Sequence, residues 1–216
     1  MAAKPYVIAL EEHYLDPEIK QATGRTDAIG PRQLIERLDD LGELRLREMD
    51  DAGIDFQVLS HSIPGLQGVD AATGVPLAQR ANNRLAEAVR AHPDRFAGFA
   101  ALPTADPRAA ADELERTVTK LGFNGAMING LTGGVFHDDE RFWPIYERAA
   151  ALDVPIYIHP ALLCCMMEMG IDRILFSVDY PFMENAPGAE WIKTLPLSAE
   201  DQQKLLNGNA RRLLKL

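Results

Sequence analysis

The sequence predicts an α/β protein with a parallel sheet, and two observations carry that prediction. Short apolar runs alternate with amphipathic stretches along most of the 216 residues, which is typical of strands joined by crossover helices. The runs themselves are apolar on both faces, as expected for strands that are covered on both sides. A closed barrel and an open doubly wound sheet share this pattern, and in both folds the functional residues gather at the carboxyl ends of the strands.

Six strands are expected, each an apolar run bounded by turn residues or by helical periodicity. They cover Val7–Leu10, Phe56–Ser60, Phe96–Leu102, Phe123–Ile128, Val154–Ile158 and Ile174–Val178. No Gly-rich nucleotide-binding turn follows the first of them, which ends instead in Glu-Glu-His. This disfavours a dinucleotide-binding fold.

The connecting helices are predicted from apolar residues spaced three or four apart. One ends near Gly53 and the next follows Pro76. A third begins at Asp106-Pro107, because a carboxylate caps free amides and proline suits the first helical turn. Further helices are expected around Phe142–Ala149, over Leu162–Met169 and from Ser198 to the C-terminus.

The composition disfavours several classes of protein. A net charge of −10 argues against a nucleic-acid partner, because a protein that neutralises phosphates needs a basic face. No apolar run approaches the ~20 residues that span a bilayer, and the N-terminus lacks a signal-peptide pattern. The two cysteines, Cys164 and Cys165, are adjacent and do not suggest a disulfide framework. We therefore expect a cytoplasmic protein with a single domain over residues 1–216 that binds no nucleic acid and no membrane.

Four residues at strand ends could hold a metal ion. Glu11 and His13 follow the first strand two residues apart, so both can point to the same side, while His159 ends the fifth strand and Asp179 follows the last. Two carboxylates and two imidazoles gathered at the carboxyl ends of the strands would be energetically unfavourable unless a cation neutralises them. Mixed nitrogen and oxygen ligands suit Zn²⁺ or Mn²⁺. The sequence therefore predicts one divalent metal bound by these four side chains.

Several motifs surround these positions: Ala9–His13, Tyr157–Pro160, Arg173–Phe182, Asp94–Ala100 and Asn209–Leu213. With them the chain, from Val7 onward, resembles the amidohydrolase-2 family, and within it the metal-dependent hydroxybenzoate decarboxylases such as γ-resorcylate and 2,3-dihydroxybenzoate decarboxylases. The first motif discriminates best, since many hydrolases of the superfamily carry His-x-His where this chain has Glu11-x-His13.

The resemblance implies a TIM-barrel-like amidohydrolase fold in which Glu11, His13, His159 and Asp179 bind the metal. It also implies that Asp179 is the acid that protonates the ring carbon bearing the carboxylate. The implied enzyme is a carboxy-lyase that removes CO₂ from a small hydroxylated aromatic acid without oxidation, and we expect a homo-oligomer. His61, after the second strand, and Asn129, after the fourth, are candidate substrate contacts, whereas His137 lies in a polar loop and is expected to be solvated.

The sequence departs from the family after the fifth strand. The family continues with a lid-like loop, a sixth strand ending in His-x-Gly-Glu and a seventh strand, whereas here Pro160-Ala161 joins Leu162 directly and no histidine follows His159. Barrels run to about 250 residues or more, so this chain is expected to lack two βα units. Two alternatives therefore stay open: a metal-dependent hydrolase of a lactone or cyclic amide, and an inactive metal-binding fragment.

Overall fold

Parallel strands form the centre of the structure, a computed structural model that describes residues 5–24, 31–159, 175–178, 180–181, 185–186 and 198–216. The strands are β1 (Ile8–Tyr14), β2 (Phe56–His61), β3 (Phe96–Gly98), β4 (Ala100–Ala101), β5 (Ala126–Asn129) and β6 (Ile156–His159). They pair in the orders β1-β2-β3 and β4-β5-β6, and every pairing between them is parallel. The predicted mixed α/β fold with a parallel sheet is confirmed.

β3 and β4 are two pieces of the single strand that was predicted over Phe96–Leu102. Phe99 lies between them, and its amide still donates to Leu59 O in β2 at 2.9 Å, while the Ala100 amide turns to Gly125 O at 2.9 Å. The strand therefore passes from one neighbour to the other without a gap. Strand order thus follows chain order throughout, which is the order of a barrel and not of a doubly wound sheet, where it reverses.

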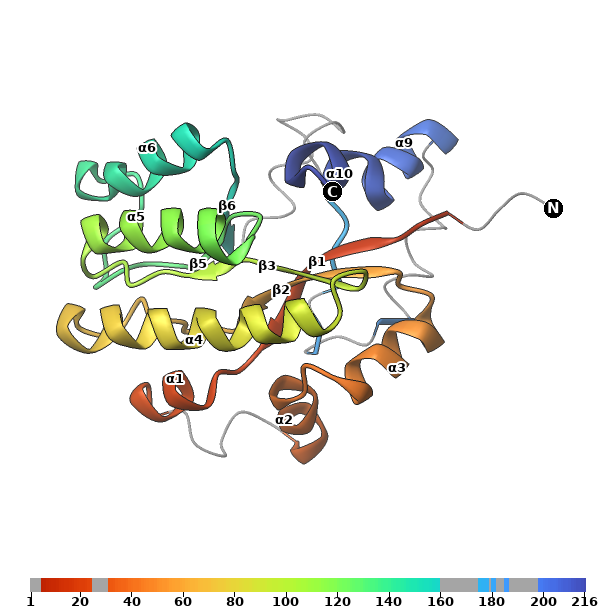
Figure 1. The fold of residues 1–216 in the computed structure, drawn as a ribbon, viewed down its shortest axis with the longest axis horizontal. Helices are drawn as coiled ribbons and strands as arrows, with labels where there is room; N and C mark the ends of the chain where they lie inside the picture. Colours follow the sequence, from red (N-terminus) through yellow and green to blue (C-terminus); the bar gives the residue numbers. More distant parts are fainter. Residues whose placement is uncertain (1–4, 25–30, 160–174, 179, 182–184, 187–197) are drawn as a thin grey trace.

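Helices cover the outer face and one end of these strands. They are α1 (Pro17–Ala22), α2 (Arg32–Asp39), α3 (Glu43–Ala52), α4 (Ala71–Ala91), α5 (Pro107–Arg116), α6 (Trp143–Leu152), α9 (Ala199–Gln203) and α10 (Asn209–Leu214), with the short helices η1 (Thr117–Leu121), η2 (Glu140–Phe142) and η4 (Lys204–Gly208). α4, α5 and α6 pack in sequence along one side of the strands (Figure 1). Among the described residues, no helix combines the length and apolarity needed to cross a bilayer.

Two predicted helices differ from the structure in their bounds. α4 begins at Ala71, ahead of Pro76, because the carboxylate of Asp70 caps the helix by accepting from the Thr73 amide at 3.0 Å. The helix expected to run to Gly53 is two helices, α2 and α3. Asp40 separates them, and its carboxylate accepts from the amides of Gly42 and Arg45, so a local side-chain cap competes with helix continuation.

The prediction of a last strand over Ile174–Val178 is wrong for the residues of this range that the structure describes. Leu175–Val178 has no strand ladder, and Ile174 lies outside the described residues, as does the helix predicted over Leu162–Met169. The segment still runs beside β1, but side chains replace the ladder. The Glu11 amide donates to Ser177 Oγ, and the Val178 amide donates to a carboxylate oxygen of Glu12 at 3.3 Å.

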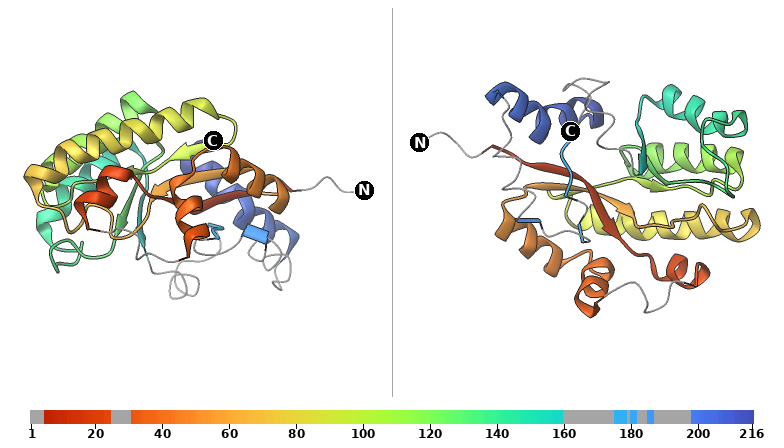
Figure 2. Two further views of the ribbon diagram at one scale, coloured as in Figure 1. Left: turned by 90° about the horizontal axis from the view of Figure 1, so that it is seen from below. Right: turned by 180° about the vertical axis from the view of Figure 1, so that it is seen from behind.

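Two apolar clusters lie on the two faces of the strands. One lies between strands and helices and includes Ala9, Leu59 and Leu85. The other gathers the opposite faces of the strands, including Ile8 and Leu10, with Ala210 and Leu214 of α10. We call this second face the inner face. α9 and α10 lie near the start of β1 (Figures 1 and 2), so they cover the amino-terminal ends of the strands and leave the carboxyl ends to form a site.

Candidate metal and substrate site

A β-bulge in β1 decides which way its polar residues face. Ala9 pairs with Gln57 and Glu12 pairs with Leu59, so β1 carries one residue more than β2 across this interval. Strict alternation would place Glu12 on the inner face with Leu10. With the bulge, Glu12 turns to the helix side, where it accepts from Gln57 Nε2 at 2.8 Å. Its neighbours Glu11 and His13 therefore lie together on the inner face, the same side, as the spacing of two predicts.

His13 is held by a hydroxyl from the neighbouring strand. The ring is 1% exposed, and its Nδ1 lies 3.2 Å from Ser60 Oγ. His13 and Ser60 are direct partners in the β1–β2 pairing. A metal-binding histidine commonly has its second ring nitrogen fixed by such a hydrogen bond, which would make Nε2 the metal-binding nitrogen here. A carboxylate such as that of Glu11, together with this imidazole, would be a donor set that fits a divalent ion.

The other two predicted metal ligands are placed only in part. His159 is the last residue of β6, and its main chain pairs with Asn129 of β5, so the predicted end of the fifth strand is confirmed. The side chain of His159, and the whole of Asp179, lie outside the described residues. Within the described residues, no three His, Cys, Asp or Glu side chains come together as a metal site. Of the four predicted ligands, only Glu11 and His13 have side chains among those residues.

His61 uses both ring nitrogens within the protein. Nε2 accepts from the Asp16 amide at 3.0 Å, and Nδ1 lies 2.7 Å from Ser62 O. The ring is 3% exposed and meets Tyr14 edge to face. A substrate contact through either nitrogen would have to replace one of these main-chain bonds, so the geometry favours a structural role at the start of α1.

Asn129 retains an unused acceptor at the carboxyl end of β5. Its Nδ2 donates to His61 O at 3.2 Å. Its Oδ1 is buried and has no hydrogen-bond partner among the described residues, and the same holds for Ser62 Oγ and Gln67 Oε1. Buried polar atoms are nearly always hydrogen-bonded in native proteins. This cluster could therefore accept or donate hydrogen bonds to a polar ligand.

Gly65 allows this cluster to pack. Its φ is +60°, and a Cβ at this position would lie 2.5 Å from Gln67 Oε1 and 2.8 Å from Asn129 Nδ2. Any other residue would therefore combine backbone strain with a clash against both amides. The glycine thus brings the loop after β2 directly against the end of β5.

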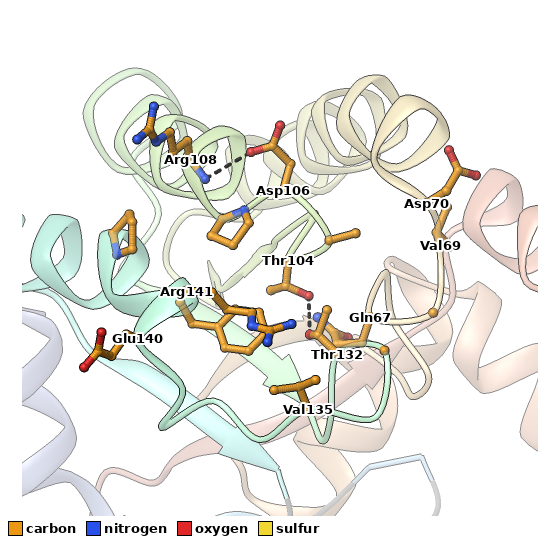
Figure 3. Close-up of a pocket in the computed structure, with 16 residues that line it drawn as sticks. Gln67, Val69, Asp70, Thr104, Asp106, Arg108, Thr132, Val135, Glu140 and Arg141 are labelled. Carbon is orange, nitrogen blue, oxygen red and sulfur yellow. Dashed lines mark hydrogen bonds between the residues drawn. The ribbon is translucent and has the colours of Figure 1, made fainter.

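A pocket of about 820 Å³ opens beside this cluster, between the loops that follow β2, β4 and β5. Gln67 belongs to both. Figure 3 shows the Thr104–Thr132 hydrogen bond, 2.6 Å long, in the middle of the pocket, with Asp70 and Asp106 at the starts of α4 and α5. Of the predicted site residues that are described, none lines the pocket. It therefore adjoins the site and is not the metal centre.

His137 was expected to be solvated, and that prediction is wrong. The ring is 8% exposed, Nε2 lies 3.0 Å from Thr132 Oγ1, and the ring stacks on Phe142 at 4.3 Å between centroids. Burial lowers the pKa of the His137 imidazole. The polar residues next to His137 in the sequence indicated an exposed side chain. In the structure the loop folds back on itself through a bridge between Thr132 and Val135, and His137 is buried.

Sequence reasoning missed Ser60, Ser62 and Gln67. The signal available was the run Ser60-His61-Ser62, in which an apolar strand ends in hydroxyls and an imidazole. That run points to a polar site at the strand end, but the pairing of Ser60 with His13 depends on the register between two strands.

Comparison with known proteins agrees with this fold. The family model described as "Amidohydrolase" matches residues 13–168 and, in a second match, residues 160–216. The chain is 42% identical over 164 residues to a γ-resorcylate decarboxylase of Rhodococcus jostii (strain RHA1), an alignment that covers 71% of this chain and 50% of that protein. In that alignment the chain spans about half the length of its relative.

A γ-resorcylate decarboxylase of Polaromonas sp. (strain JS666 / ATCC BAA-500) is 28% identical over 320 residues, covering 97% of this chain and 98% of the relative. Because the chain has 216 residues, that alignment must contain long gaps in this chain. A crystal structure of a dihydroxybenzoic acid decarboxylase from Polaromonas sp. JS666, with bound manganese and the inhibitor 2-nitroresorcinol, superposes with a TM-score of 0.88 at 28% identity, covering 99% of this chain and 98% of that one.

Proposed function

Because the chain belongs to the amidohydrolase family, we propose that it is a metal-dependent decarboxylase that removes CO₂ from a hydroxylated benzoate without oxidation. The observation that carries the proposal is the pair Glu11 and His13 on the inner face of β1, with Ser60 on the His13 Nδ1. The relatives named γ-resorcylate decarboxylase support the substrate class.

The proposed metal ligands are Glu11, His13, His159 and Asp179. A divalent metal bound there would supply positive charge that attracts the carboxylate and ortho-hydroxyl oxygens of the substrate and stabilises negative charge on the ring oxygen. The buried His13 ring, fixed by Ser60, would keep its position without reorganisation when metal and substrate enter. The bound manganese of the Polaromonas structure supports Mn²⁺ as the ion, and Zn²⁺ remains part of the proposal on the chemistry of the ligands.

Asp179 is proposed as the acid. Its carboxyl group gives a proton to the ring carbon that bears the substrate carboxylate, which interrupts the aromatic ring. The bond from that carbon to the carboxylate then breaks, its electron pair returns to the ring, and CO₂ leaves with aromaticity restored. A proton from solvent restores the Asp179 carboxyl group, so the balance needs no oxidant or reductant.

Substrate hydroxyls are proposed to meet the cluster around Asn129. Asn129 Oδ1 and Gln67 Oε1 are acceptors that a phenolic hydroxyl could donate to, and Ser62 can donate or accept. His61 was also a candidate contact, and we now propose that it acts by supporting Asn129, whose Nδ2 it holds through its carbonyl oxygen.

A second candidate is a metal-binding chain without turnover. The two family matches meet at residues 160–168, directly after β6, and the alignment with the Polaromonas relative must contain long gaps in this chain. Both observations agree with the expected loss of two βα units and of the histidine that the family carries there. Metal binding can survive that loss, because all four proposed ligands are retained.

We further propose that residues 1–216 form one incomplete β/α barrel domain, that the protein works in the cytoplasm, and that it assembles as a homo-oligomer. Its proposed partner is a small aromatic acid, with no nucleic acid and no membrane.

The deciding experiment supplies 2,6-dihydroxybenzoate to the Mn²⁺-loaded protein and measures CO₂ and resorcinol. We expect equal amounts of both products from the wild type, and neither product from Asp179→Asn when enough Mn²⁺ is supplied to give the two proteins the same metal occupancy. Hydrolysis of a lactone panel without CO₂ release would overturn the decarboxylase in favour of the hydrolase. Bound metal with neither activity would favour the chain without turnover.

A further inference from the structure

A chain of buried polar side chains runs behind the proposed metal centre, on the helix side of β1. Glu12 and Arg45 are both 0% exposed, and so is Gln57, which lies between them. Gln57 Nε2 donates to Glu12 at 2.8 Å, and Gln57 Oε1 accepts from Arg45 Nη1 at 3.4 Å. An anion on one side and a cation on the other fix which way the Gln57 amide points.

At its two ends, this set of side chains is hydrogen-bonded to main-chain groups at or next to proposed metal ligands. At one end Arg45 Nη2 donates to the carbonyl oxygen of His13 at 2.6 Å. At the other end the second carboxylate oxygen of Glu12 accepts from the Val178 amide at 3.3 Å. The His13 amide in turn donates to Tyr180 O. The main chain on both sides of position 179 is therefore attached to β1.

Arg45 is anchored from several directions. Its guanidinium lies over the Tyr180 ring, 4.5 Å from the centroid, and Nε donates to Asp40 O at 3.1 Å. The Tyr180 hydroxyl donates to Glu48 at 2.7 Å. A buried cation with this many fixed partners costs desolvation energy that apolar packing would not. Stability alone is therefore a poor account of its presence.

We propose that Glu12, Gln57 and Arg45 form a clamp that positions β1 against the segment around position 179, and so sets the spacing of the metal ligands on the two segments. Glu12 and Arg45 are positioning residues, since they lie on the face of β1 opposite Glu11 and His13. The inference rests on the metal-dependent function proposed above.

The experiment measures Mn²⁺ affinity of the full-length chain by titration, well below its unfolding temperature. Glu12→Gln keeps the size of the side chain but leaves one uncharged acceptor oxygen for two donors, Gln57 Nε2 and the Val178 amide, which bond to separate carboxylate oxygens in the wild type. We expect Mn²⁺ affinity to fall about tenfold to a hundredfold, as for other residues that orient metal ligands. The electron paramagnetic resonance spectrum of the Mn²⁺ that still binds should change as well, because the ligand geometry changes.

Glu113→Gln is the matched control. Glu113 is also buried, accepts from Asn82 Nδ2 at 2.7 Å and pairs with Arg116 at 2.8 Å. Its partner Asn82 bonds to Ala101 of β4, away from β1. We expect Glu113→Gln to lower the unfolding temperature but to leave Mn²⁺ affinity and the spectrum as in the wild type. Equal losses of affinity in both variants, or none in Glu12→Gln, would overturn the clamp.

Hydrogen exchange of the metal-free protein tests the clamp without the metal. Glu12→Gln should speed exchange of the Val178 amide, while Glu113→Gln should not. A wild-type protein that binds no Mn²⁺ would overturn the proposed function, and the exchange of Val178 would still decide the clamp. Unchanged Val178 exchange in Glu12→Gln would overturn it.

Discussion

Ser60 Oγ lies 3.2 Å from Nδ1 of His13, and the two residues are direct partners across the β1–β2 pairing. This contact exists because the bulge in β1 shifts the alternation of the strand by one residue, which brings His13 onto the inner face opposite Ser60. The hydroxyl then holds the imidazole in one orientation, which leaves Nε2 as the nitrogen that we propose binds the metal.

Ser60→Ala should weaken Mn²⁺ binding by about tenfold or more, because the His13 ring loses the hydrogen bond that orients it. Titration of the metal-free protein with Mn²⁺ measures the affinity. Ser62→Ala is the control, since Ser62 is equally buried and its hydroxyl has no partner among the described residues. An equal affinity in the two variants would show that the Ser60 contact does not orient the metal ligand.

His13→Ala should abolish stabilisation by metal. At Mn²⁺ concentrations about a hundred times the dissociation constant, binding to the native state alone adds about 2.7 kcal/mol to the free energy of unfolding. Thermal unfolding with and without Mn²⁺ measures this gain. His92→Ala serves as control, because His92 lies at the end of α4 against Phe96 and its loss should leave the metal-dependent shift intact.

Asn129→Ala should raise KM for the dihydroxybenzoate roughly tenfold with a smaller change in kcat, since a lost hydrogen bond costs about 1 to 1.5 kcal/mol. Steady-state kinetics separates the two constants. Asn124→Ala is a control from the segment just before the same strand, where Asn124 Nδ2 donates to Leu214 O at 2.8 Å. If Asn124→Ala raised KM as much, the effect would come from the strand and not from substrate contact.

His137→Gln should reduce the loss of stability in mild acid. Burial lowers the pKa of His137 below its ordinary value of 6.5, so the unfolded chain binds more protons than the native one below that pH. The contribution of the neutral His137 ring to the free energy of unfolding is present above about pH 6.5, and it is lost as the pH falls toward the pKa of the native state. Urea unfolding at about pH 7.5 and about pH 5.5 measures it. Identical losses in wild type and variant would contradict the prediction.

The amino-acid pattern alone located most of the sheet. Apolar runs bounded by turns predicted the ends of β2, β5 and β6 to within a few residues. A strand that is covered on both faces is apolar along its whole length, so the limits of the apolar run mark the limits of the strand. The start of α5 at Pro107 was predicted for a local reason as well, since Asp106 caps the amides of Arg108 and Ala109. Such features depend on neighbours in sequence and can be predicted without the fold.

What only the tertiary structure decided depends on contacts between distant residues. Because Glu11 and His13 are two residues apart, the sequence predicted that they share a face of the strand. The bulge that turns them to the inner face, however, arises from the register of β1 against β2. The segment Leu175–Val178 is apolar like a strand, yet its amides meet Leu205 O and the Glu12 carboxylate in place of a ladder. Arg45, fully buried, would be predicted to be solvated from its sequence neighbours. Hydrophobic periodicity indicates which positions are buried. Strand register and long-range polar partners are fixed only when distant segments meet, here segments 32 and 166 residues apart in the chain.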